Sequence, residues 1–433
     1  MKYDIKEIKK GIKIHYINTD KFKTNLVAIF LTTDLDKEAV TKNALIAPVL
    51  TRGTTKMPTQ EEISKALEGM YGALFDCGIE KKGNNQILKF YIESVNDRFL
   101  PDLQENLLTK SVETLLEIVF SPYIENGAFK KEYVEQEKNN LKQVIEGRKD
   151  NKAKYALDRC MEEMYKGDNY EIYRLGYAED IEKIDEKNLY EQYQKLINNC
   201  KIDIFISGIL DEDKNEIIEK NQLLNNMKER EGKLIKANFD IKSRENENIV
   251  FENMDVVQGK LVLGLDVNIK DEKQQNDVLL YNSILGGSAN SKLFQNVREK
   301  ASLAYTASSS YLRIKNSIFI NCGIEIENYD KALKIIKEQI SDMKEGKFTD
   351  EEVENVKKEL ISAIKAIDDE QDTQIMYLFG QEFSKEKVLT EEYEKRVRNV
   401  SKQDIIDVAN LVKINTIYFL TNKDGGGENA NHQ

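Results

Sequence analysis

The sequence predicts an α+β protein made of two homologous domains, each a mostly antiparallel sheet with helices packed on one side. Two observations indicate this architecture. The order of apolar segments in the first half recurs in the second, and a polar stretch at residues 227–250 separates the halves. The offset between matching segments is nearly constant: Leu261 follows Leu26 by 235 residues, Gly286 follows Gly53 by 233, and Ile318 follows Ile87 by 231.

The domain boundaries follow from this repeat. We predict an N-terminal domain at 1–226, a connector at 227–250, a C-terminal domain at 251–423 and a loose tail at 424–433. A chain of 433 residues is long enough to bury two hydrophobic cores of this size.

The first half contains strands where β-branched residues cluster and helices where apolar residues recur every three or four positions. Gly53 is a helix stop, and Thr59 with Glu62 forms a capping box that begins the next helix. We predict strands at 11–15, 26–31, 86–92 and 200–207, and helices at 43–50, from 59 to 70, from 129 to 144 and at 152–164.

The second half repeats these elements. We predict strands at 261–265 and 317–321, and the segments 278–286 and 292–305 echo the first two helices of the N-terminal half. A further capping box, Thr349 with Glu352, begins a helix near the C-terminus.

Composition excludes several classes of function. The 64 basic and 76 acidic residues give a net charge of −12, and no basic block is present that would neutralise a nucleic-acid backbone. The first residues lack an apolar core of signal-peptide length, so we expect no signal peptide, and in the absence of a run of eighteen apolar residues we expect no membrane span. Four scattered cysteines suit a reducing cytoplasm, so we expect a cytoplasmic protein.

Histidine limits the chemistry most sharply. The chain has two, His15 on a predicted strand and His432 in the tail, so no pair one helical turn apart can hold a zinc ion. A Ser-His-Asp or Cys-His arrangement would have to recruit His15. A structural role for His15 is the favoured interpretation, and spacing singles out no carboxylate pair.

A family resemblance rests on four segments: 45–54, 135–138, 175–180 and, most specific, the run Leu285–Tyr305. Over nearly all of residues 1–423 the chain resembles the insulinase/pitrilysin peptidases, inverzincins that carry H-x-x-E-H on an early helix and a third ligand, a glutamate, on a later one. The resemblance implies two domains that form half of a clam-like chamber.

The zinc motif is degenerate in this alignment. Anchoring it on Arg52 to Thr54 puts Ala44 and Pro48 at the two histidine positions, Ala47 at the general-base glutamate and Val144 at the third ligand. None of these side chains can bind zinc or activate water. Pro48 also removes a backbone donor, so we expect a reshaped helix. The resemblance therefore implies a chain that is inactive alone and holds no cofactor, with zinc only in a partner subunit.

The C-terminal half keeps candidate substrate-binding residues. The resemblance implies that Arg298 and Tyr305, seven positions apart, contact the peptide and the developing oxyanion; alternatively, Arg298 lies on a solvated helix face and Tyr305 in the core. Gly286 and Gly287 either end a helix or form a loop that contacts the peptide.

The resemblance implies a noncatalytic subunit that pairs with a zinc-bearing insulinase-family partner to bind and help process peptides. One alternative is a structural or peptide-binding protein without a proteolytic role. An active metalloendopeptidase is disfavoured, although whether the chain takes part in an enzyme stays open. A homodimer is an alternative assembly for the isolated chain.

Overall fold

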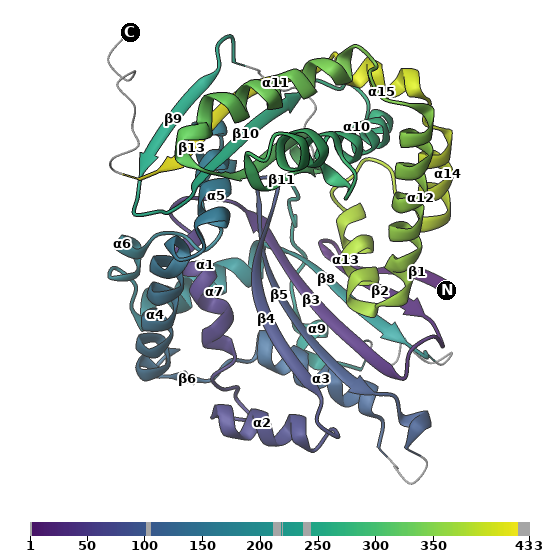
Figure 1. Ribbon diagram of the computed structural model, residues 1–433. Coiled ribbons are helices and arrows are strands. Elements are labelled where there is room, and N and C mark those ends of the chain that lie inside the picture. Colours follow the sequence, from purple (N-terminus) through teal and green to yellow (C-terminus); the bar gives the residue numbers. More distant parts are fainter. Residues whose placement is uncertain (1, 101–104, 211–217, 219, 237–243, 423–433) are drawn as a thin grey trace. The chain divides into compact units, whose positions relative to one another are not determined.

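The computed structural model describes residues 2–100, 105–210, 218, 220–236 and 244–422, so the predicted tail at 424–433 lies outside the described residues. The chain forms two compact units, each of which includes a segment from the other half of the sequence (Figure 1). Unit 1 comprises Met1–Glu146, Ile172–Ile235 and Glu370–Phe379, and unit 2 comprises Gly147–Glu171, Lys236–Asp369 and Gly380–Gln433. In the middle of the sequence the division between the units falls between Ile235 and Lys236.

Unit 1 is built on a six-stranded sheet in the order β1-β2-β8-β3-β5-β4. Neighbouring strands are antiparallel except β2 and β8, which run parallel. The central strands are apolar on both faces, as expected of strands that are covered twice. The strands are β1 Lys2–Lys9, β2 Ile12–Asn18, β3 Thr24–Asp34, β4 Leu74–Lys82, β5 Asn85–Val95 and β8 Lys201–Gly208.

One face of this sheet packs against a layer of helices and forms the main core of unit 1. The predicted capping box of Thr59 and Glu62 is present at the start of α2. The helices are α1 Val40–Leu50, α2 Gln60–Glu68, α3 Leu107–Phe120, α4 Lys131–Glu146, α6 Ala178–Ile181, α7 Glu186–Asn199 and α9 Gln222–Asn226, with the small hairpin β6 Ile124–Glu125 and β7 Ala128–Phe129.

The opposite face of the unit 1 sheet is covered by α13 (Gln371–Gln381), which comes from the far end of the sequence. The Phe379 ring stacks on Phe30 of β3 with centroids 4.0 Å apart. At the other end of α13, the buried Gln371 accepts a hydrogen bond from the Thr24 hydroxyl at 2.8 Å and donates to the Ser207 hydroxyl at 3.2 Å.

Unit 2 contains a five-stranded sheet in the order β11-β12-β10-β13-β9, antiparallel except for the parallel pair β13 and β9. Its core lies between this sheet and a second helical layer. The capping box of Thr349 and Glu352 is present at the start of α12. The elements are β9 Asn248–Asn253, β10 Gly259–Val267, α10 Gln275–Asn282, β11 Ala304–Leu312, β12 Ser317–Ile324, α11 Tyr329–Lys344, α12 Asp350–Ala366, α14 Thr390–Asn399, α15 Lys402–Ala409 and β13 Val412–Thr421.

The opposite face of the unit 2 sheet is covered by α5 (Lys152–Met164), which comes from the first half of the sequence. Gly264 of β10 lets α5 approach closely, because a Cβ at this position would come 2.6 Å from the Met164 sulfur. The predicted α+β class with two antiparallel-rich sheets is confirmed. In addition to the predicted helical layer, each sheet carries one helix on its other face.

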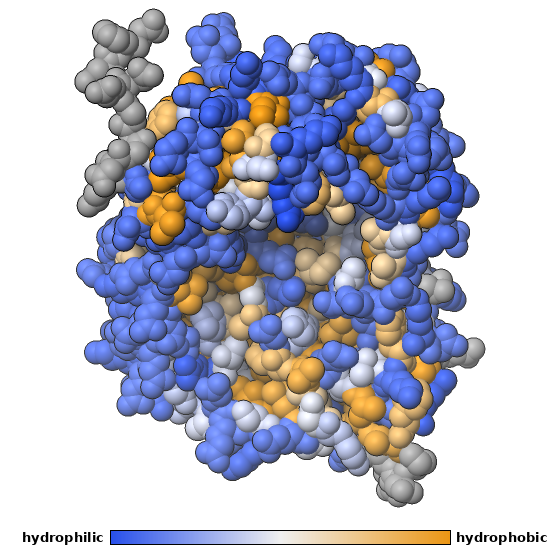
Figure 2. Space-filling model, viewed as in Figure 1, coloured by the Kyte–Doolittle hydropathy of each residue, from blue (hydrophilic) through white to orange (hydrophobic). Residues whose placement is uncertain are grey.

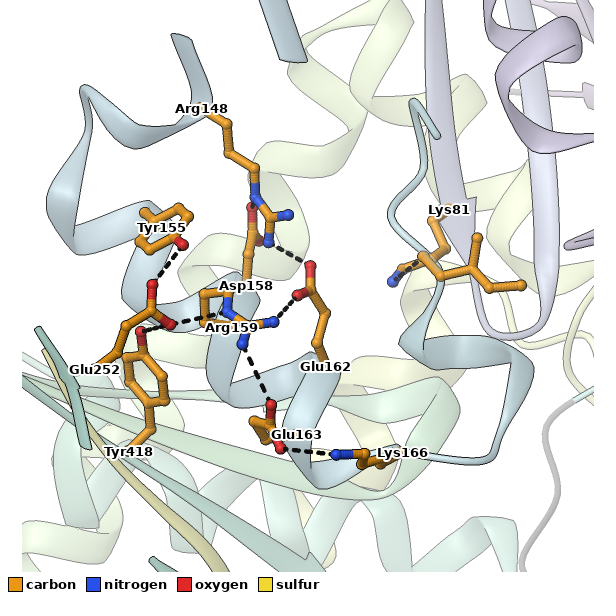
Figure 3. A network of polar contacts seen from close by, with 11 residues as sticks. Lys81, Arg148, Tyr155, Asp158, Arg159, Glu162, Glu163, Lys166, Glu252 and Tyr418 are labelled. Atoms are coloured by element: carbon orange, nitrogen blue, oxygen red, sulfur yellow. Dashed lines mark hydrogen bonds and ion pairs between the residues drawn. The ribbon is translucent and has the colours of Figure 1, made fainter. Parts of the chain in front are cut away.

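A polar network fixes α5 to the sheet of unit 2 (Figure 3). The Glu252 carboxylate of β9 accepts hydrogen bonds from the hydroxyls of Tyr155 at 2.6 Å and Tyr418 at 2.8 Å, and from Arg159 Nε at 3.0 Å. Partial burial pushes the pKa of Glu252 upward, but these three donors outweigh it and hold the pKa below its ordinary value. Arg159 also pairs with Glu162 and Glu163 of its own helix.

Among the described residues, no helix combines the length and the apolar character that crossing a bilayer requires.

Candidate functional site

The first three positions of the degenerate zinc motif lie on α1. Ala44 and Ala47 are buried in the core of unit 1, and Pro48 is partly buried. Their side chains contain only carbon and hydrogen, so they offer neither a metal ligand nor a base. The expected reshaping of this helix is wrong, since α1 stays helical through Pro48. Pro48 lies in the last turn, where it costs a single backbone hydrogen bond and where the Thr51 hydroxyl donates to its carbonyl at 2.8 Å.

The fourth position, Val144, lies near the end of α4, a helix that contacts α1. Its side chain is 57% exposed, whereas the next residue, Ile145, packs against the core of unit 1. The predicted helix start at Phe129 is also wrong: Phe129 belongs to β7, and α4 begins at Lys131.

One carboxylate of α4, Glu137, is buried and already has partners. Arg52 lies two residues after the end of α1. Its guanidinium forms an ion pair with Glu137 and donates a further hydrogen bond to the Gln60 side chain at 2.9 Å. The Asn140 amide donates to the other Glu137 oxygen at 3.1 Å. Arg52 therefore neutralises the one acidic side chain that α4 buries.

These residues do not fit a zinc ion. A zinc site needs three or four nitrogen, sulfur or carboxylate donors, and the four motif positions supply none. Within the part of the chain that the structure describes, no three His, Cys, Asp or Glu side chains gather in an arrangement that could hold a metal. We therefore assign no chemical step in this chain to a metal.

His15 is buried in unit 1, and both of its ring nitrogens have polar partners. Nε2 lies 3.0 Å from Asp203 and Nδ1 lies 2.7 Å from the Tyr3 hydroxyl, while the ring stacks on Phe205 with centroids 4.0 Å apart. Asp203 also accepts two hydrogen bonds from the buried Lys201 amine. A His-Asp pair therefore exists, but its role is to satisfy buried polar groups between strands, as the structural interpretation of His15 predicts.

The glycines of the C-terminal candidate segment lie in a π-helical turn, Ser283–Gly287, that ends α10. Gly286 is buried against β11, and a Cβ there would lie 2.7 Å from the Ser309 backbone nitrogen. Gly287 is exposed. Neither glycine has a positive φ, so neither forms a left-handed cap at the end of the helix. The last helical hydrogen bond runs from the Ser288 amide to the Ser283 carbonyl at 3.1 Å.

Arg298 lies in a second π-helical segment, Phe294–Lys300. Its guanidinium carbon is 4.6 Å from the centre of the Phe294 ring, and Nε is 3.5 Å from a Glu299 carboxylate oxygen. The side chain is 45% exposed. This helical segment ends at Lys300, and the chain enters β11 at Ala304. The predicted helix at 292–305 is therefore shorter than expected.

Tyr305 is an extra residue in the pairing of β11 with β12, where the register shifts between Ala304 and Thr306. This bulge turns the Tyr305 ring outward, and 61% of the residue is exposed, so the alternative that places it in the core is wrong. The Tyr305 hydroxyl donates to Glu325 at 3.1 Å, and this bond raises the pKa of the phenol. Ser302, just before the strand, has a φ of 53°.

Unusual backbone therefore concentrates between residues 283 and 305: two π-helical turns, a left-handed serine and a bulge. Such features often occur at functional sites. The sequence singled out the four candidate residues of this segment but gave no sign of Glu325, which directly follows β12. It also gave no sign of the Arg52–Glu137 pair, whose members are 85 positions apart.

We expect Gly286→Ala to lower the free energy of unfolding by about 1–3 kcal/mol, because the added methyl group would overlap the β11 backbone. Gly78→Ala is the matched control: a Cβ on Gly78 in β4 would have no atom within 4 Å, so we expect little change. Urea denaturation of both variants measures the difference. Equal stability of the two would contradict the tight packing of Gly286 on β11.

Comparisons with known proteins agree with this fold. A family profile described as the peptidase M16 inactive domain matches residues 183–360. A Bacillus subtilis protein described as "Probable inactive metalloprotease YmfF" is 33% identical over 423 residues, 98% of each chain. A conserved protein from Enterococcus faecalis superimposes with a TM-score of 0.89 at 28% identity, over 98% of this chain and 99% of that one.

A peptidase M16 inactive domain from Pseudomonas fluorescens shares the fold, with a TM-score of 0.78 at 17% identity over 98% of this chain and 99% of that one. The fold, together with hydrocarbon side chains at the motif positions of α1, thus defines a chain of inactive-peptidase architecture. At 33% identity over nearly its full length, the chain belongs to the peptidase M16 family, the insulinase/pitrilysin family that its sequence resembles.

Proposed function

We propose that this chain is a noncatalytic subunit that pairs with a zinc-bearing M16 subunit to bind and help process peptides. The observation that carries the proposal is a contrast between two helical segments. The motif positions on α1 hold only hydrocarbon, whereas the segment 283–305 presents Arg298 and Tyr305 to solvent on irregular backbone. The description of the Bacillus subtilis relative as a "Probable inactive metalloprotease" supports the noncatalytic assignment.

The chemistry of Arg298 and Tyr305 suits the peptide carbonyl. A guanidinium offers fixed N–H donors and a phenol offers one O–H donor, and both stabilise an oxygen whose negative charge grows during attack by water. In our proposal the attacking water and its metal belong to the partner subunit. The Tyr305 hydroxyl would leave Glu325, its present acceptor, to reach the substrate.

The edge of the unit 2 sheet supports peptide binding at the same place. β11 pairs with β12 alone among the described strands, so its outer edge can add an extended peptide as a further strand. Tyr305 lies at the start of β11, and Gly286 packs against the middle of the strand. A peptide on this edge would lie beside the candidate residues.

Reconstitution tests the proposal. We expect the purified chain to form a complex with a zinc-bearing M16 subunit from the same genome and to stimulate its cleavage of a fluorogenic peptide. A complex without stimulated cleavage would instead favour a structural or peptide-binding protein. Stoichiometric zinc in the isolated chain, together with chelator-sensitive cleavage, would contradict the proposal.

We also propose a reducing, cytoplasmic location. All four cysteines are free thiols, and Cys160, Cys200 and Cys322 are buried. Burial raises the pKa of Cys200 to about 12, which keeps this thiol protonated and unreactive at neutral pH.

A further inference from the structure

The helical stretch at residues 292–300, which contains Arg298, begins without a cap. The amides of its first three residues, Lys292, Leu293 and Phe294, donate to no backbone or side-chain acceptor among the described residues. Amides of a first helical turn have no acceptor within the helix, and the aligned peptide dipoles give this end a partial positive charge. The start of the helix therefore presents three donors that the described part of the chain does not use.

The residue before the helix, Ser291, adds a further donor. Ser291 is only 2% exposed, and its hydroxyl has no hydrogen-bond partner among the described groups. A serine at this N-cap position usually accepts a hydrogen bond from the second or third amide of the helix, here Leu293 or Phe294. Because an N-cap side chain lies against the first turn, the unused hydroxyl and the unused amides converge on one place. A buried hydroxyl without a partner is costly, which favours a ligand that accepts from it.

The sequence around this place is cationic in an acidic chain. From Val278 to Arg298 the two charged residues are Lys292 and Arg298, both cations, although the whole chain has 76 acidic residues and a net charge of −12. Lys292 is half-buried and forms no ion pair with a described residue. Unused amides at a helix start together with a nearby amine attract an anion.

The helix starts over the middle of β11. A Cβ on Gly286 would lie 2.8 Å from Leu293 Cδ1 and 2.7 Å from the Ser309 backbone nitrogen, so both residues pack against the same glycine. Figure 2 shows hydrophobic and weakly polar patches on the surface around the place where Figure 1 labels β11. An extended peptide on the free edge of β11 would therefore pass close to the helix start.

We propose that this helix start binds a carboxylate of an extended peptide that lies along β11. The amides of Leu293 and Phe294 and the Ser291 hydroxyl donate to the carboxylate oxygens, which together can accept about four hydrogen bonds. The Lys292 amine supplies the opposite charge. The carboxylate belongs either to an aspartate or glutamate side chain or to the C-terminus of the peptide.

The position of the site along β11 predicts where a substrate would be cut, a step that rests on the proposed function. In that function Tyr305 contacts the carbonyl under attack. Ser309, beside the helix start, lies four residues further along the strand, or about 13 Å at the rise of a β-strand. A peptide paired with β11 would thus hold its carboxylate about four residues from the bond that is cleaved.

Fluorescence anisotropy of three fluorescein-labelled nonapeptides with the full chain tests the site. The first has a central glutamate and an amidated C-terminus, the second has glutamine and an amidated C-terminus, and the third has glutamine and a free C-terminus. We expect the glutamate peptide, the free-acid peptide or both to bind about tenfold more tightly than the neutral one, which also identifies the source of the carboxylate. The net charge of −12 opposes both acidic peptides, so nonspecific attraction does not produce this preference.

Two variants and a matched control locate the preference. Ser291→Ala and Lys292→Gln should each reduce it to about twofold, whereas Lys300→Gln, at the other end of the same helical stretch, should leave it unchanged. Ser291→Ala should not lower the free energy of unfolding in urea, because the hydroxyl makes no bond in the described chain. Equal affinity for the three peptides, or a full preference in both variants, would overturn the proposal.

Reconstitution with a zinc-bearing M16 subunit separates this site from the proposed function. We expect mass spectrometry of the products to place the cut about four residues from the glutamate. A carboxylate preference in the isolated chain without stimulated cleavage would contradict the proposed function and leave the site intact. Stimulated cleavage at positions that ignore the glutamate, in a chain without the carboxylate preference, would overturn the site and leave the proposed function intact.

Discussion

Arg298→Ala should lower the turnover of the reconstituted complex about a hundredfold, or about 2.7 kcal/mol in transition-state stabilisation. The reason is the loss of a preorganised donor at the point where the carbonyl oxygen gains charge. The Arg298 guanidinium is held by the Phe294 ring and by Glu299, so little reorganisation is needed when substrate arrives. The measurement is the steady-state kinetics of peptide cleavage at saturating subunit concentration.

Two controls separate this role from assembly. The affinity of the variant chain for the zinc-bearing subunit, measured by isothermal titration calorimetry, should equal that of wild type. Arg313→Ala removes another arginine of unit 2, which contacts Gln275 and Tyr393 rather than the candidate segment, and turnover should fall far less. Full turnover with Arg298→Ala in an intact complex would remove Arg298 from the site.

Glu252→Gln should lower the free energy of unfolding by about 2 kcal/mol at pH 7. The glutamine amide keeps one acceptor oxygen but loses the charge, so Arg159 loses one of its three carboxylate partners and one of the two tyrosine hydroxyls loses its acceptor in a partly buried place. Glu247→Gln is the matched control: it removes an exposed carboxylate that pairs with Lys337, and its effect should stay within about 0.5 kcal/mol. Chemical denaturation measures both.

The same carboxylate predicts a pH dependence. The pKa of folded Glu252 lies below its ordinary value of 4.5, so its contribution to stability is present above that value and is lost as pH falls through the folded pKa. The difference between wild type and Glu252→Gln should therefore shrink as the pH falls below 4.5. A difference that is constant from pH 7 to the acid limit would show that the charge of Glu252 is not what anchors α5.

Local signals in the sequence predicted much of the fold. The capping boxes at Thr59 and Thr349 were found correctly because such a box involves only residues three positions apart. The predicted helix at 152–164 matches α5 in both bounds. Its packing partners could not be predicted, because the apolar face of α5 says only that something covers it. The strands that cover it, β10 and β13, begin 107 and 260 positions after the start of α5.

The candidate site was predictable in composition but not in geometry. The hydrocarbon at Ala44, Ala47 and Pro48 follows directly from the sequence, and the side-chain chemistry alone argues against zinc. Val144 belongs to the helix predicted from 129 to 144, yet its side chain faces solvent, and the next residue, Ile145, is the one that packs against the core of unit 1. The π-helical turns around Arg298 depend on how the chain enters β11, a tertiary constraint that helical periodicity does not report.

The exchange of α5 and α13 between the two halves of the sequence has a consequence for how the protein can be divided. A gene cut in the connector would give an N-terminal fragment without the Phe379 ring that stacks on Phe30, and a C-terminal fragment without the helix that covers Val262 and Tyr418. Each fragment would expose a bare apolar sheet face to water and tend to aggregate. Each half therefore acquires a complete core only when both halves are synthesised as one polypeptide.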